Sequence, residues 1–145
     1  MQFSWALVTL LLLPTQLSSS TPQTCFETAK TQSELNECAE NGMKAAKQEL
    51  YAVYQQILRN KKDEKEFLVK LTKAQQAWLI FRDAELDAIF PKTDKPTEYG
   101  TVYHMCYLQW KSRLTLERTT QLRKWLNGVA EGDVCSGSLP FKKKN

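Results

Sequence analysis

The sequence contains one histidine, five glycines and five prolines, and it lacks the residue groups that common catalytic sites need. The histidine, His104, is two residues from Cys106, where two side chains on a helix do not face each other, and the four cysteines do not have zinc-site spacing. There is no glycine-rich phosphate loop and no supported Ser/His/Asp arrangement. We therefore predict no enzyme activity, no metal site and no cofactor.

Charged residues are missing from residues 1–20, which hold one apolar run from Ala6 to Leu13. This run is too short for a spanning helix, which needs roughly 20 residues, and it is typical of a secretory signal peptide. Ser18 and Ser20 suit the positions before a cleavage site, so we expect the mature chain to begin near Thr21. An uncleaved anchor is disfavoured by the short run. We expect a secreted, soluble protein without a membrane or lipid anchor.

The formal charge of +4 belongs wholly to the part after residue 20. Lys142, Lys143 and Lys144 contribute three of these charges, and the rest of the chain is nearly neutral. The net positive charge therefore does not indicate nucleic-acid binding. The length predicts one domain over residues 21–128, followed by an extension over residues 129–145 with a basic tail.

An even number of cysteines in a secreted chain favours disulfides, and four cysteines allow three pairings. We prefer Cys25 with Cys38 and Cys106 with Cys135, because each bond joins cysteines that are near in sequence and none is left over. In the chain-entropy model each such bond contributes on the order of 3 to 4 kcal/mol.

The first long helix is predicted from Thr31 to about Asn60. Thr31 and Glu34 have the spacing of a capping box, in which each side chain binds the other residue's backbone N–H. Gly42 costs about 1 kcal/mol relative to alanine in a helix. We expect a kink or a short break there, and a continuous helix is nearly as well supported. The predicted inner face comprises Leu35, Cys38 or Ala39, Met43, Ala46, Leu50, Val53 or Tyr54, and Ile57.

A second helix is predicted from the charged stretch 61–66 to Phe90, where Pro91 ends it. Its predicted inner face comprises Leu71, Ala74, Trp78, Phe81 and Glu85. Arg82 follows Trp78 by four residues, so its guanidinium can lie against the indole or reach a neighbouring helix, while the Asp83 side chain points elsewhere. Trp78 and Arg82 are the sharper binding candidates. The structural alternative is a core tryptophan with an arginine paired to a carboxylate such as Glu34 or Glu85.

Residues 91–100 are predicted to form an exposed connection, because they contain two prolines and a glycine without an apolar period. A third helix then runs from about Thr101 to Leu126, ended by Asn127-Gly128. Its predicted inner face comprises Val102, Met105, Gln109, Ser112, Leu116, Thr119 and Leu126. Three helices of similar length predict an all-α fold, an antiparallel up-and-down bundle stapled by disulfides. The extension would fold back so that Cys135 reaches the third helix.

Three segments resemble, in the same order, the lysozyme inhibitor LprI-like N-terminal domain family. They are TQSELNECA at 31–39, KAQQAWLIFRDAE at 73–85 and MCYLQWKSRLTLERTTQL at 105–122. The resemblance implies a small, helical, exported bacterial domain of the periplasm, with a protein such as lysozyme as its partner. The matching positions are Asn36, Cys38, Gln75, Trp78, Arg82, Asp83 and Cys106.

One position departs from the family pattern. The family commonly has a cysteine three residues after the motif's aspartate, where this chain has Leu86. If that cysteine usually pairs with the one matching Cys106, then Cys135 is the evident substitute, or Cys106 stays a free thiol.

A net positive chain needs a local acidic patch to bind a basic lysozyme, because like charges slow encounter. Glu34, Glu37 and Glu40 are the candidates for this patch. The neighbouring pair Asp83 and Asp87 is interpreted as a solvated helix face rather than an acid/base pair. The alternative function is an envelope interaction or toxin-neutralising module without lysozyme activity, and a peptidoglycan-acting enzyme is the least supported.

Overall fold

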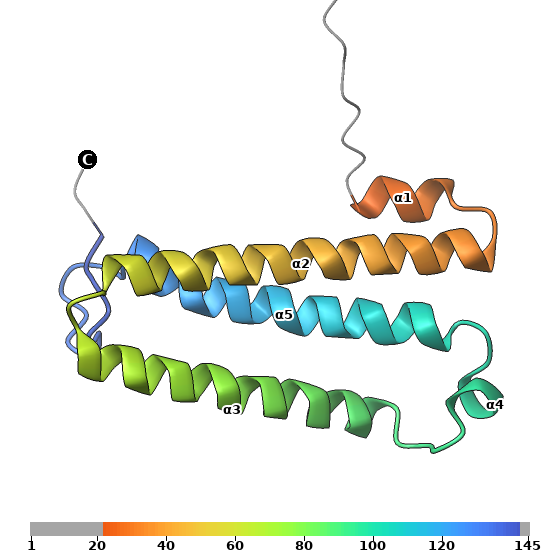
Figure 1. Ribbon diagram of the computed structural model, residues 1–145. Helices are drawn as coiled ribbons and strands as arrows, with labels where there is room; N and C mark the ends of the chain where they lie inside the picture. Colours follow the sequence, from red (N-terminus) through yellow and green to blue (C-terminus); the bar gives the residue numbers. More distant parts are fainter. Residues whose placement is uncertain (1–21, 143–145) are drawn as a thin grey trace, which may run out of the picture.

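The computed structural model describes residues 22–142, which form five helices (Figure 1). The helices are α1 (Pro22–Thr28), α2 (Gln32–Asn60), α3 (Lys65–Ile89), α4 (Lys95–Tyr99) and α5 (Tyr103–Asn127). The predicted signal peptide, Lys143 and Lys144 lie outside the described residues. Within the described part, no helix has the length and apolar character needed to cross a membrane.

The start of α2 confirms the predicted capping box. The Thr31 hydroxyl accepts a hydrogen bond from the Glu34 backbone N–H at 3.2 Å, and the Glu34 carboxylate accepts one from the Thr31 N–H at 2.9 Å. The helix ends at Asn60, as predicted, and it runs through Gly42 without a break. The local cost of one glycine is small beside the long apolar face that α2 buries along its length.

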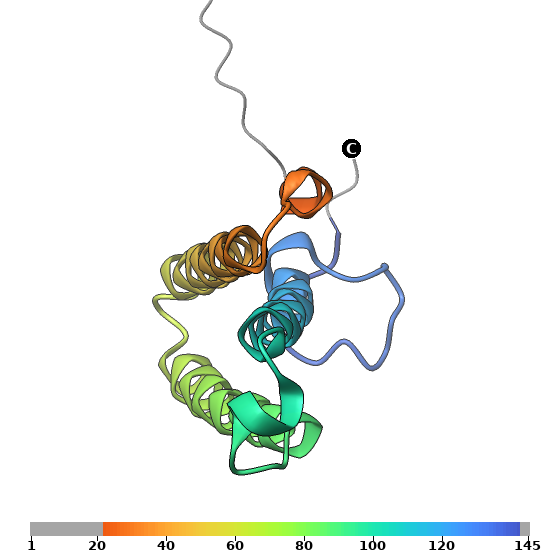
Figure 2. The ribbon, with the colours of Figure 1, turned by 90° about the vertical axis from the view of Figure 1, so that its right-hand side faces the viewer.

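Both ribbon views show α2 and α5 side by side, with α3 standing further from them (Figures 1 and 2). The three long helices alternate in direction along the chain (Figure 1). The prediction of an all-α fold with a disulfide is confirmed for the described residues. The predicted antiparallel bundle of three long helices is not confirmed, because the closest packing joins α2 to α5 and α3 packs less closely.

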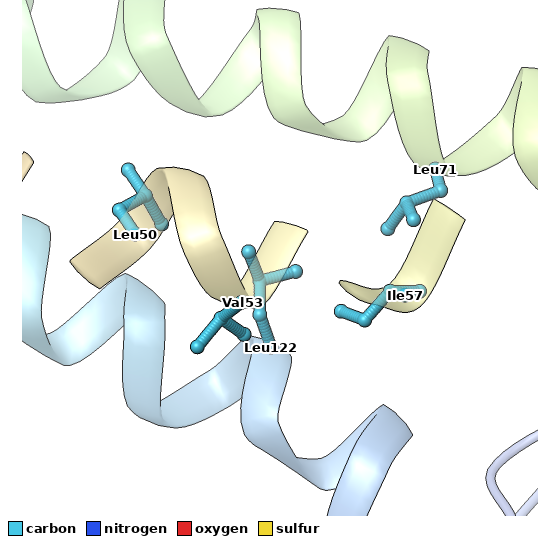
Figure 3. Packing of buried hydrophobic residues seen from close by; sticks show 5 residues of the cluster. All are labelled: Leu50, Val53, Ile57, Leu71 and Leu122. Atoms are coloured by element: carbon cyan, nitrogen blue, oxygen red, sulfur yellow. The ribbon is translucent and has the colours of Figure 1, made fainter. Parts of the chain in front are cut away.

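The main core cluster draws on all three long helices. Its buried members are Leu50, Val53, Ile57, Leu71 and Leu122, which point toward one another (Figure 3). Ile57 is fully buried and Leu122 is 1% exposed, so these side chains occupy the centre of the cluster. The predicted inner face of α2 is largely confirmed, because its repeat of three and four residues matches the buried positions.

The predicted inner face of α5 is partly wrong. Thr119 is buried as predicted, but Val102 and Leu116 are exposed, and the other buried positions are Thr115 and Leu122. Each buried threonine donates its hydroxyl proton to the carbonyl oxygen four residues earlier, at 2.7 and 2.9 Å. These local hydrogen bonds satisfy the hydroxyls, so threonine can occupy an interior position that a search for apolar residues does not find.

The connection between α3 and α5 contains the short helix α4, which was not predicted. The Asp94 carboxylate caps it by accepting from the Thr97 N–H. Phe90, which is buried, makes edge-on contacts with Tyr99 and Tyr103, with ring centroids 5.4 and 5.3 Å apart. Burial in this aromatic cluster raises the pKa of Tyr103 above its ordinary value.

The Cys25–Cys38 disulfide is present and links α1 to α2, as predicted. The predicted Cys106–Cys135 bond is wrong, because both cysteines are free. Cys106 lies near the start of α5, and Cys135 follows the other end of this helix, roughly 30 Å away along its axis. A disulfide requires Cα atoms within about 7 Å. The extension closes at its own end of α5 and does not return along the helix.

Thiol counting tests this cysteine assignment. Alkylation of the folded protein without reductant is expected to add two labels, measured by intact mass, because only Cys106 and Cys135 carry thiols. Exposed Cys135 should react before half-buried Cys106. A Cys135→Ser variant should accept one label. Complete resistance to alkylation would show that the second disulfide forms.

Gly128 closes the C-terminal extension. Its φ of +74° is unfavourable for other residues, and a Cβ there would lie 2.7 Å from backbone atoms of Pro140, Phe141 and Lys142. Hydrogen bonds from the Val129 N–H to the Pro140 carbonyl and from the Lys142 N–H to the Val129 carbonyl complete the loop. The extension therefore depends on the absence of a side chain at this position.

Two glycine substitutions separate this clash from the cost of positive φ. Gly132 has a φ of +91° with open space around it, so Gly132→Ala is expected to cost about 1 to 2 kcal/mol, through backbone strain alone. Gly128→Ala adds the clash and should open residues 129–142, seen as faster hydrogen exchange and proteolysis there. Equal behaviour of the two variants would contradict the close approach.

Candidate functional site

The inward side of α3 differs from the predicted one. Leu71 and Leu86 are buried and Gln75, Trp78 and Arg82 are half-buried, whereas Ala74, Phe81 and Glu85 are exposed. The inward residues recur at intervals of three and four, the period of one helix face. The family motif residues Gln75, Trp78 and Arg82 therefore all turn toward the other helices.

Trp78 lies between two guanidinium groups. The Arg82 guanidinium is 5.3 Å from the indole ring centre, as the spacing in the sequence predicts, and the Arg118 guanidinium of α5 is 6.0 Å from it. A cation over an indole face is attracted by the ring's quadrupole. Arg118 was missed from the sequence because no periodic rule links it to a residue 40 positions earlier.

Asp83 is the ionic partner of Arg82. Its carboxylate accepts hydrogen bonds from the Arg82 Nε and Nη2 atoms at 2.9 and 2.7 Å, and Lys111 Nζ of α5 lies 3.7 Å from it. The expectation that the Asp83 side chain lies away from Arg82 is therefore wrong. Arg82 does pair with a carboxylate, as the structural alternative proposed, but with Asp83 in place of Glu34 or Glu85. Adjacent residues on a helix diverge, but the long arginine side chain bends far enough to reach its neighbour.

Arg118 binds amide oxygens. Its Nε donates to Gln75 Oε1 at 3.0 Å, and its Nη1 donates to Gln121 Oε1 at 3.2 Å. Burial lowers the pKa of Arg118, but the side chain remains charged at any physiological pH. The family motif thus forms a continuous polar and cation–π network between α3 and α5.

Two hollows border this network. One, of about 470 Å³, contains Arg118 and is lined by Glu66, Phe67, Lys70, Leu71, Ala74, Trp125 and Ser138. The other, of about 280 Å³, contains Gln75 and Arg82 and is lined by Met43, Lys47, Leu50, Tyr51, Tyr54, Leu79 and Thr115. The Arg82 side chain is only 12% exposed, so the motif offers little surface to a large partner. Its main contacts are within the protein.

The three candidate carboxylates of α2 have different surroundings. Hydrogen bonds from the backbone N–H groups of Lys30 and Thr31 lower the pKa of Glu34, which belongs to the helix cap. Glu40 lies 2.9 Å from His104 Nε2 of α5. Glu37 is exposed beside the disulfide, and Asn36 accepts a hydrogen bond from Gln32. Glu37 is thus the member of this set with no structural partner shown.

Within residues 22–142, no three His, Cys, Asp or Glu side chains come close enough to hold a metal ion. Asp83 is engaged with Arg82, and Asp87, one turn further along the same side of α3, is exposed and lines neither of the two hollows. The described residues therefore bring no evident acid/base pair together at a cavity.

A family profile described as Lysozyme inhibitor LprI matches residues 25–122, about two thirds of the sequence. The chain belongs to the LprI lysozyme inhibitor family. The matched span begins at the disulfide, includes the whole Trp78 network and ends in α5. Neither curated proteins nor solved structures show a significant match. The LprI family is named for inhibition rather than for catalysis.

From these contacts we predict that Arg118 contributes more than Arg113 to the free energy of unfolding. Arg118→Met removes one cation from Trp78 and leaves Gln75 without its donor, which should cost about 1 to 2 kcal/mol in chemical denaturation. Arg113 is the matched control, because it lies 3.8 Å from the Trp110 ring centre but is 62% exposed. Arg113→Met should cost less than about 0.5 kcal/mol. Equal costs would show that α3 does not depend on Arg118.

Proposed function

We propose that this protein is an exported inhibitor that binds and blocks a cell-wall hydrolase such as lysozyme. The observation that supports this most strongly is the LprI family match, which spans the disulfide and the network that positions α3. A binding role fits the described residues, which present a rigid helical scaffold and engage their conspicuous motif in internal contacts.

The Cys25–Cys38 disulfide supports a location outside the cytoplasm, where such bonds persist. The predicted signal peptide over residues 1–20 agrees with this location. We propose the bacterial periplasm as the compartment, because inhibition there would protect the cell wall from hydrolases that enter the envelope.

Charge on α2 is proposed to assist encounter with a basic hydrolase. Glu37 and Glu40 are exposed near the start of α2, and the only contact shown for Glu40 is with exposed His104. Surface carboxylates change association rates more than they change the strength of the final complex. Glu34 is a poor choice for testing this idea, because its removal would also remove the helix cap.

The function is tested by titrating the mature protein against animal, bacterial and phage lysozymes while following lysis of suspended cell walls. Stoichiometric inhibition that persists at physiological salt is expected. Absence of inhibition for all of these enzymes would refute the proposal and favour another envelope partner.

The role of α2 is tested separately by the variant Glu37→Lys with Glu40→Lys. A slower association with a basic lysozyme, roughly tenfold at low salt, is expected because two attractive charges become repulsive. The control Glu98→Lys with Glu117→Lys makes the same change in net charge at exposed positions on α4 and α5. Equal association rates for the two variants would exclude the start of α2 from encounter.

A further inference from the structure

The outward side of α3 is apolar over three turns. It comprises Ala77, Ile80, Phe81, Ala84 and Ala88, which share one face at intervals of three and four and are all exposed. Ile80 is 73% exposed and Phe81 is 56% exposed. We name these five residues the α3 outer face. In Figure 2, α2 and α5 both lie to one side of α3, which leaves its opposite side uncovered.

Helix α3 carries apolar residues on two opposite sides. The inward side holds Leu71, Trp78 and Leu86 beside the polar Gln75 and Arg82, while the outer face holds Ile80 and Phe81. A surface helix normally turns its apolar stripe toward the core and its polar residues toward water. Single exposed apolar residues are common, but a contiguous group of them marks an interaction site.

Carboxylates lie on both sides of the α3 outer face. Asp83 and Asp87 border one side of it and Glu85 borders the other, and all three are exposed. Between Lys73 and Lys92 the only basic residue is Arg82, which is 12% exposed and pairs with Asp83. Lys111 of α5 also lies 3.7 Å from Asp83, so Glu85 and Asp87 are the rim carboxylates without a basic partner shown. This apolar face therefore has an acidic rim, which complements a partner with a positively charged surface.

The start of α2 has no comparable group of exposed apolar residues. From Thr24 to Leu50 no large hydrophobic side chain is exposed, so this region offers charge without an apolar centre. Protein interfaces are held mainly by a few apolar or aromatic side chains that become fully buried, with a polar rim around them. Ile80 and Phe81 with their acidic rim match that arrangement.

We infer that the α3 outer face is the docking surface for a basic cell-wall hydrolase, with Ile80 and Phe81 as the anchors and the rim of Asp83, Glu85 and Asp87 facing cationic residues of the partner. This inference rests on the proposed function and specifies the surface that performs it. The network around Trp78 then acts indirectly, because it fixes the rotation of α3 and so determines which residues face outward.

The test compares binding of the wild-type protein and exposed-site variants to an animal lysozyme that the wild type inhibits. Ile80→Ser and Phe81→Ser should each weaken binding by roughly tenfold to a hundredfold, because each removes an apolar side chain that the complex buries. Val134→Ser is the matched control, since Val134 is 97% exposed and lies in the extension. Circular dichroism and thermal unfolding should show that all three variants stay folded.

A second variant tests the rim. Glu85→Lys with Asp87→Lys should slow association, and the difference from the wild type should shrink as salt is added. If Ile80→Ser and Phe81→Ser bind the lysozyme as tightly as the wild type does, the proposed docking surface is wrong, but the inhibitor function is unaffected. Failure of the wild type to bind any hydrolase would overturn the function itself. If sedimentation shows that the wild type is a dimer and that Ile80→Ser is a monomer, then the α3 outer face binds a second copy of this chain, and the proposal of a basic partner is wrong.

Discussion

The position of α3 depends on the contact of Trp78 with two arginines. Arg82 comes from the same helix and Arg118 comes from α5, and the Gln75 side chain joins Arg118 directly. Apolar packing also attaches α3, since Leu71 belongs to the main buried cluster and Phe67 and Trp78 pack against it. The polar contacts supply directionality that apolar contacts lack, so they fix the rotation of α3 about its axis as well as its place. The side of α3 that faces water is a consequence of this rotation.

Local sequence signals predicted local structure well. The capping box set the start of α2, and the apolar repeat from Cys38 to Ile57 identified its buried face. Pro91 and Gly128 marked the ends of α3 and α5 within a residue or two. These features depend on interactions between residues a few positions apart, which is why a single sequence contains enough information to place them.

Features that depend on contacts between distant segments were predicted less well. The inward side of α3 was missed because Gln75 and Arg82 are polar, and their partners on α5 are unknown until the helices are placed. Thr115 was missed for a related reason, since its buried hydroxyl is satisfied within its own helix. The proposed pairing of Cys106 with Cys135 failed because sequence proximity ignores the length of the helix between them. Of the predicted site residues, Gln75, Trp78, Arg82 and Asp83 are joined by contacts with one another and with Arg118, whereas Glu34, Glu37 and Glu40 lie exposed at the start of α2.

The Cys25–Cys38 bond has a consequence for how this molecule loses structure. It joins α1 to the first turns of α2, whereas the apolar cluster lies along the later turns, from Leu50 to Ile57. Among the described helices, α1 packs mainly on α2. We therefore expect reduction to free α1, which is too short to stay helical alone, while the pair of α2 and α5 keeps its apolar core. The disulfide therefore determines whether α1 stays attached to α2, and the folding of the α2–α5 core does not depend on it.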